Sequence, residues 1–275
     1  MNTSPTPPQR SVEEKVALLL KLMCDPTTAW TTEEVWCRIK AWVGDDIAPI
    51  LLKHLQSDDP GIVRLLLNVF EFELEVKGEQ TLTEHIDTFL TMLQHEDLLV
   101  RQAAVDLFGV LSVADGKVIS ELRQIISTDD PYLATQAAVT ILKLKHDEAD
   151  RLLPFLIVML HQDKPMIKLV VLDCVDSLGK RAEKLLPHIF TQLEKGFVDS
   201  DAALAILKIT GDDAHAWRVV GKWRQEEEED EPKIIQQAAD ELEEEIKRIM
   251  SNRSHSLGIG PPIFPRTNHN SSNSP

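Results

Sequence analysis

The chain has few of the residues that interrupt or cross-link helices. Its 275 residues include 11 glycines, 3 cysteines and 5% aromatic residues, and no useful stretch alternates apolar with polar side chains. The missing alternation argues against β-strands. Cys24, Cys37 and Cys174 lie far apart in apolar stretches, so we predict buried free thiols rather than a disulfide framework or a zinc site. These absences together predict an all-α protein.

Long hydrophobic stretches are also missing. No apolar run approaches the ~18 residues that a membrane-spanning helix requires. Residues 1–10 are polar and rich in proline, without the hydrophobic centre of a signal peptide. We therefore expect a cytoplasmic protein that makes no contact with membranes.

Basic residues are outnumbered, because 29 lysines and arginines stand against 45 aspartates and glutamates, for a formal net charge of −16. The excess is uneven: residues 226–245 hold eleven acids against Lys233, and the other 255 residues carry only −6. A nucleic-acid groove needs a basic stripe that displaces counterions from phosphates, and the sequence shows none. The charge pattern argues against nucleic acid as a ligand.

What the chain does contain is a repeated unit: an apolar helix, a short acidic turn and a second helix carrying two adjacent small or aliphatic residues. The pairs are Leu66-Leu67, Ala103-Ala104, Ala137-Ala138, Val170-Val171 and Ala202-Ala203. Their first members are separated by 37, 34, 33 and 32 residues, a period typical of helical solenoids. Four positions after each first member stands a predicted core residue: Phe70, Leu107, Ile141, Cys174 and Ile206.

Local signals predict where helices begin. Ser11 with Glu14, and Thr31 with Glu34, have the spacing of capping boxes. Proline is tolerated in the first turn of a helix, so we expect three first helices to begin at the prolines Pro49, Pro154 and Pro187.

The acidic turns predict caps for the second helices, because a carboxylate there meets the positive end of the helix dipole. Basic residues stand two positions before three of the repeated pairs, at Arg64, Arg101 and Lys168. We expect these cations to pair with the acidic turn of a neighbouring repeat.

The sequence Glu-Asp-x-x-Val-Arg-Gln-Ala-Ala at Glu96–Ala104, with the Leu-Leu-Pro pattern of two first helices, resembles the HEAT repeat. The short steps fit the phycobilisome-lyase-like variety of this repeat. The resemblance covers Ile47–Gly211, with residues 13–44 as a degraded first repeat. It implies a right-handed α-α superhelix of about five to six helical pairs. It implies little about activity, because HEAT-like proteins include scaffolds, adaptors, assembly factors and a few enzymes.

We divide the chain into five segments. Residues 1–11 are predicted to be disordered, 12–223 to form the solenoid, 224–232 an acidic linker, 233–250 an amphipathic helix and 251–275 a disordered tail. An isolated helix of this length is marginal in water, so the apolar stripe of 233–250 must be buried. It could dock on a partner or self-associate, but we expect it to fold back on the solenoid.

No constellation of reactive groups predicts catalysis. The paired carboxylates lie in turns, where capping explains them, and no two histidines have metal-binding helical spacing. We predict structural roles for His54, His95 and His161 near helix ends and for His188 near a helix start. The sequence therefore predicts no catalytic residue, no cofactor, no metal and no enzymatic activity.

The candidate partner-binding face is the side of the second helices opposite the apolar stripe, because stacked second helices usually line the concave side of a solenoid. Its members are Gln102, Asp106, Gln136, Thr140, Lys143, Asp173 and Asp176. They are polar and mixed in charge, and a merely solvated face remains the alternative interpretation. We predict a non-catalytic protein-protein interaction scaffold or adaptor. The alternative, a chromophore lyase or isomerase subunit, is implied only by the resemblance.

Overall fold

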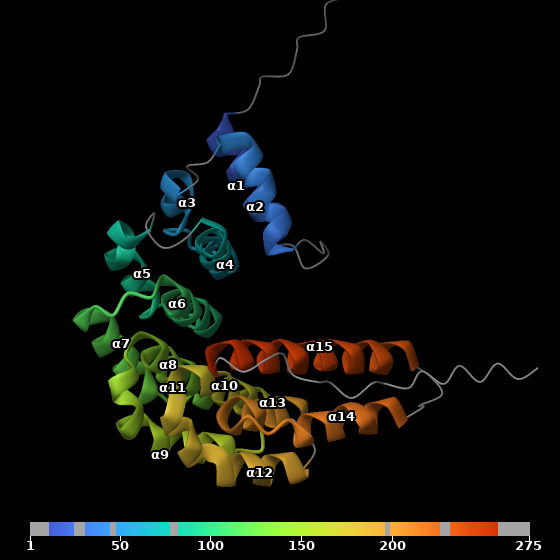
Figure 1. Cartoon of the computed structure of the whole chain (residues 1–275). Coiled ribbons are helices and arrows are strands. Elements are labelled where there is room, and N and C mark those ends of the chain that lie inside the picture. Colours follow the sequence, from blue (N-terminus) through green and yellow to red (C-terminus); the bar gives the residue numbers. More distant parts are fainter. Residues whose placement is uncertain are drawn as a thin grey trace, which may run out of the picture. The chain divides into compact units, whose positions relative to one another are not determined.

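The computed structural model describes residues 11–24, 31–44, 48–77, 82–195, 199–225 and 232–257 (Figure 1). Every regular element in these ranges is a helix, which confirms the all-α class. The chain divides into two compact units, Met1–Glu148 (unit 1) and Ala149–Pro275 (unit 2), where the sequence predicted one continuous body over 12–223. Within the described ranges, no helix combines the length and the apolar character needed to cross a membrane.

Unit 1 is a series of helical hairpins. Its α-helices are α1 (Val12–Met23), α2 (Thr32–Val43), α3 (Ala48–His54), α4 (Pro60–Lys77), α5 (Ile86–Met92), α6 (Leu98–Leu111), α7 (Gly116–Ile126) and α8 (Pro131–Leu144). Short 3-10 helices, η2 (Thr83–His85) and η3 (His146–Glu148), precede α5 and end the unit. The second helices of successive hairpins are neighbours, because α4 packs on α6 and α6 packs on α8.

Unit 2 continues the alternation. Its helices are α9 (Ala149–Leu160), α10 (Pro165–Asp173), α11 (Val175–Leu178), the 3-10 helix η4 (Gly179–Leu185), α12 (Leu186–Lys195), α13 (Asp199–Thr210), α14 (Ala214–Gln225) and α15 (Pro232–Leu257). The sequence predicted one second helix where α10 and α11 lie. The structure breaks this helix at Cys174, whose thiol donates a hydrogen bond to the Val171 carbonyl at 2.9 Å.

The repeated columns form the core, as predicted. All five residues of the column from Phe70 to Ile206 are at most 1% exposed. Nine of the ten residues in the adjacent pairs are buried, and Val170 is half-buried. Small residues in this position let neighbouring second helices approach closely, which explains why alanine recurs there.

The capping boxes are confirmed. The Glu14 and Ser11 amides donate to each other's side chains at 3.2 and 2.8 Å, and Thr31 and Glu34 do the same at 2.9 and 3.2 Å. Of the three prolines predicted to begin helices, one does not. Pro49 and Pro187 lie in first turns, but Pro154 lies inside α9, because this helix begins earlier, at Ala149, directly after a 3-10 turn.

The C-terminal helix folds back on its own unit, as expected. Helix α15 lies along α13 and α14 (Figure 1), and its Leu242 and Ile246 pack with Ala203, Leu207 and Val220. It ends at Leu257, seven residues beyond the predicted boundary, so the disordered tail predicted from 251 is wrong over 251–257. The other predicted disordered residues, 1–10 and 258–275, and the linker residues 226–231 lie outside the described residues.

Candidate partner-binding face

The face predicted from sequence is assembled in unit 1 by two neighbouring second helices. Helix α6 contributes Gln102 and Asp106, and α8 contributes Gln136, Thr140 and Lys143. The two helices pack against each other, and the alanines of their repeated pairs are at most 6% exposed. Polar residues 30 positions apart in the sequence are thereby brought into contact.

Gln136 and Asp106 form the centre of this contact. The Gln136 amide Nε2 donates to the Asp106 Oδ1 at 2.9 Å and to its Oδ2 at 3.1 Å. The Thr140 hydroxyl donates to the Val105 carbonyl at 3.4 Å, a long and therefore weak hydrogen bond. The Gln136 Oε1 is buried without a hydrogen-bond partner. The contact thus joins α6 to α8 while leaving one buried acceptor unsatisfied.

Burial changes the roles of two predicted face residues. Gln136 is only 7% exposed and Thr140 only 5%, so neither presents its side chain to a partner. Asp106 and Lys143 are exposed, and Gln102 is half-buried. The prediction that Gln136 and Thr140 face solvent treated α8 as a single helix. In the structure, neighbouring helices cover more of the α8 surface than such a projection shows. The accessible face of unit 1 therefore consists of Gln102, Asp106 and Lys143.

The Asp106 carboxyl is electrostatically unusual for an exposed residue. Desolvation by the surrounding helices raises its pKa to about 6, against the opposing effects of the Lys143 charge and the Gln136 hydrogen bond. Desolvation and the Asp106 charge also raise the pKa of Tyr132, the only tyrosine in the chain. No sequence motif indicates this raised pKa, because it arises from helix packing.

The two face residues predicted in unit 2 lie at a helix break. Asp173 ends α10 and Asp176 belongs to the short helix α11; both are exposed. The Asp176 Oδ2 accepts from the Lys208 Nζ of α13 at 2.9 Å. Asp176 therefore bridges two elements of unit 2.

Within the basic column, Arg101 does not pair as predicted. The Arg101 Nη1 donates to the carbonyls of His95 and Glu96 at 2.6 and 2.9 Å, so it stabilises the turn of its own hairpin. Arg64 is exposed, whereas Lys168 is 2% exposed. The expected pairing with the acidic turn of a neighbouring repeat is wrong for Arg101, because the turn carbonyls are closer partners for its guanidinium.

The acidic turns before α6 and α8 cap these helices as predicted, whereas Lys164, the N-cap residue of α10, makes no side-chain capping hydrogen bond. The Asp97 Oδ1 accepts from the amides of Leu99 and Val100 at 2.9 and 3.1 Å, and the Asp130 Oδ1 accepts from the Leu133 amide at 2.7 Å. These bonds satisfy amides that have no partner within the helix. Capping therefore accounts for these carboxylates without any role in chemistry.

Two histidines that the sequence treated separately meet in unit 2. The His161 Nε2 lies 2.9 Å from the His188 Nδ1, and the buried Gln192 Nε2 lies 3.4 Å from the His161 Nδ1. Among the described residues, no three potential metal ligands of the His, Cys, Asp or Glu type are grouped together. The cysteines are less buried than predicted: Cys174 is buried, Cys24 is half-buried and Cys37 is exposed.

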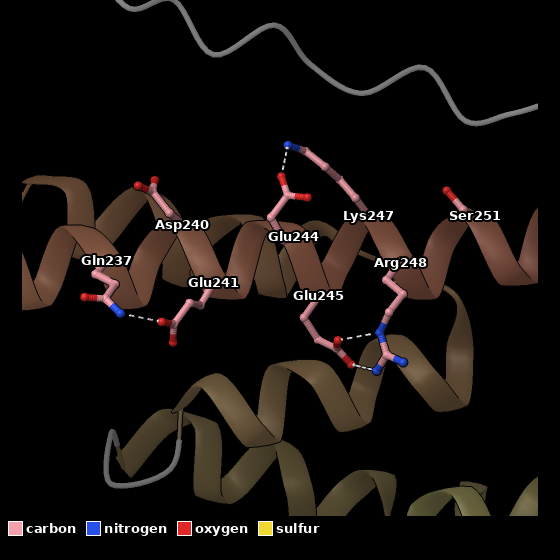
Figure 2. Close-up of a pocket in the computed structure, with 8 residues that line it drawn as sticks. All are labelled: Gln237, Asp240, Glu241, Glu244, Glu245, Lys247, Arg248 and Ser251. Atoms are coloured by element: carbon pink, nitrogen blue, oxygen red, sulfur yellow. Dashed lines mark hydrogen bonds and ion pairs between the residues drawn. The ribbon is translucent and has the colours of Figure 1, made fainter.

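Helix α15 carries a dense set of charged residues (Figure 2). Glu245 accepts from Arg248 at 2.6 and 2.7 Å, Glu244 accepts from Lys247 at 2.8 Å, and Gln237 donates to Glu241 at 2.8 Å. All eight labelled residues belong to this one helix, and the interactions drawn join residues three or four positions apart. This surface is therefore a solvated, internally paired helix face.

No protein-family model matches the sequence. No curated protein matches it significantly either.

Proposed function

We propose that the chain is a HEAT-like α-solenoid that acts as a non-catalytic protein-protein interaction scaffold. The observation that carries this proposal is the packing of α4, α6 and α8, the second helices of three successive hairpins, side by side in unit 1. Such stacking is the defining contact of helical solenoids, in which each repeat contacts only its neighbours. The buried columns from Phe70 to Ile206 support the same architecture.

The partner-binding surface in this proposal is the accessible face of unit 1. Asp106 and Lys143 offer one charge of each sign, and Gln102 can both donate and accept hydrogen bonds. Beneath them, the Gln136–Asp106 contact holds the two helices in register. A rigid, polar surface of this kind binds a folded protein with little loss of conformational entropy on its own side.

Site-specific photo-crosslinking tests the proposal. A photoreactive amino acid is introduced at Gln102 or Lys143, and separately at the control positions Lys117 and Gln124 on α7, which are exposed on a first helix. The expected result is the same identified protein captured from both face positions and from neither control. Equal capture at all four positions, or capture of no common protein from the face, would contradict the proposal. A shifted visible absorbance on mixing with a bilin would instead favour the chromophore-lyase alternative.

A further inference from the structure

A separate cavity lies within unit 2, between α12 and α14, with a volume of about 320 Å³. One wall is apolar and consists of Phe190, Leu193 and Val219. The other residues are charged or titratable: Asp199, His215, Arg218 and Lys222. None of these residues belongs to the partner-binding face proposed above. A test of one site therefore does not decide the other.

The apolar wall is held by the core of the unit. Val219 is 5% exposed and belongs to the core cluster around Ala203 and Ile246, and Leu193 packs against that cluster. The Phe190 ring meets the His215 ring edge to face, with centroids 5.2 Å apart and planes at 65°. These contacts fix the wall before any ligand enters, which reduces the entropy lost on binding.

The charged residues give the cavity a local excess of positive charge. His215, Arg218 and Lys222 occupy positions i, i+3 and i+7 of α14 and therefore share one helix face. The Lys222 Nζ lies 3.7 Å from the Asp199 Oδ2, and Asp199 is largely buried. Arginine can only donate, so the Arg218 Nη1, 3.3 Å from the His215 Nδ1, requires that nitrogen to be unprotonated.

Arg218 is the group best suited to contact an anion. Arg218 is exposed. Within the described part of the chain, its guanidinium contacts the His215 imidazole rather than a carboxylate. A guanidinium binds a carboxylate through two parallel hydrogen bonds, which a lysine cannot reproduce. The net charge of −16 on the whole chain disfavours binding of an anion. Charges more than about 10 Å from the cavity are largely screened at physiological salt, however, so the nearby cations dominate.

We infer that this cavity binds an acidic peptide segment of a partner protein, in which an aromatic or branched aliphatic side chain adjoins a carboxylate. The apolar side chain lies against Phe190 and Leu193, and the carboxylate pairs with Arg218 and Lys222. A cavity of about 320 Å³ is at the lower end of the range for ligand pockets, which suits one large side chain and a flanking group.

Binding of a short probe to the full chain tests the inference. The probe is a fluorescent, end-blocked Gly-Glu-Phe-Glu-Gly peptide, with Gly-Gln-Phe-Gln-Gly and Gly-Glu-Ala-Glu-Gly as matched controls. We expect saturable binding of the probe, at least tenfold weaker binding of either control, and perturbed amide NMR signals in α12 and α14. The affinity should fall as salt is raised. No saturation at millimolar protein, or equal binding of all three peptides, would overturn the inference.

Variants then locate the site. Arg218→Gln and Lys222→Gln should each weaken binding at least fivefold, whereas Lys164→Gln and Lys180→Gln, exposed lysines elsewhere in unit 2, should leave it unchanged. Unaltered melting temperatures show that the variants remain folded. Unchanged affinity in both pocket variants contradicts the site. Free 3-phenylpropanoate that binds as tightly as the probe contradicts a peptide ligand and indicates a small-acid site instead.

Discussion

Two helix contacts, α6 with α8 in unit 1 and α13 with α15 in unit 2, involve helices that carry buried alanines of the same repeated column, but the contacts differ in the polar groups that they contain. The α6–α8 contact includes the buried Gln136 and Thr140 and the Asp106 carboxylate. The α13–α15 contact is apolar, through Ala203, Leu207, Leu242 and Ile246. The same sequence column therefore occurs at helix contacts of different chemistry.

The polar groups of the α13–α15 contact lie at its end. The Arg253 Nη1 donates to the carbonyls of Leu207 and Lys208, both at 3.2 Å, and thereby satisfies the C-terminal end of α13. Gly211 makes this approach possible: its φ is +82°, and a Cβ there would lie 2.7 Å from the Arg253 guanidinium carbon. Arg253 also gives a physical reason for α15 to continue past residue 250.

The largest expected effect comes from removing an apolar side chain from the α13–α15 contact. Ile246→Ala deletes a fully buried side chain at the α13–α15 contact, and we expect it to lower the free energy of unfolding by about 3 kcal/mol. Urea denaturation measures the loss, and hydrogen exchange should accelerate in α15. Asn252→Ala, at an exposed position of the same helix, is the control and should change stability by less than about 0.5 kcal/mol.

Arg253→Ala should cost less, about 1.5 kcal/mol, because it removes two charged hydrogen bonds at a partly buried site. Gly211→Ala provides a sharper test. In the wild-type background it adds both backbone strain and a collision with Arg253, whereas in the Arg253→Ala background only the strain remains. The double-mutant cycle should therefore show coupling; strictly additive losses would mean that Arg253 does not occupy this position.

Gln136→Leu tests the polar contact of unit 1. It removes the donor to Asp106 but also a buried, unsatisfied Oε1, so we expect a net loss of only about 1 kcal/mol at pH 7. At pH 5 the loss in the free energy of unfolding should be smaller. Asp106 is then largely protonated, and a neutral carboxyl group gains less from the Gln136 hydrogen bond than a carboxylate does. An equal loss at both pH values would show that Gln136 acts through packing alone.

The smallest effect concerns the charge of Asp106. Its folded-state pKa of about 6 lies above the unfolded value, so the folded state binds more protons between about pH 4 and pH 6, and stability falls as pH rises through this window. Asp106→Asn keeps an acceptor for Gln136 and should remove this decline. The difference should stay below about 1 kcal/mol, because an exposed carboxylate retains part of its hydration. Parallel pH profiles of the two proteins would contradict the raised pKa.

Much of the fold could be predicted because its signals are local or periodic. The capping boxes at Ser11 and Thr31, and the buried column from Phe70 to Ile206, depend on spacing within a helix or a repeat. The errors arose where a turn next to the helix decides. Pro154 is inside α9 because the preceding turn starts the helix early, and Arg101 bonds to backbone carbonyls that composition does not reveal.

The candidate site was predicted less well than the fold. Gln102, Asp106 and Lys143 are accessible, but Gln136 and Thr140 are covered, because a helix projection cannot show how far the neighbouring helices extend. The cavity between α12 and α14 left no motif in the sequence. Its residues come from three helices: two from α12, Asp199 from α13, and four from α14.

The sequence by itself determined that the chain is helical, where most helices begin, and which residues form the core, because each property depends on neighbours within one turn or one repeat. Tertiary structure alone decided which polar side chains are buried, that Asp106 titrates near pH 6, where α15 ends, and that a cationic cavity forms in unit 2. These properties depend on desolvation and on contacts between helices, and both are set by distances in space rather than along the chain.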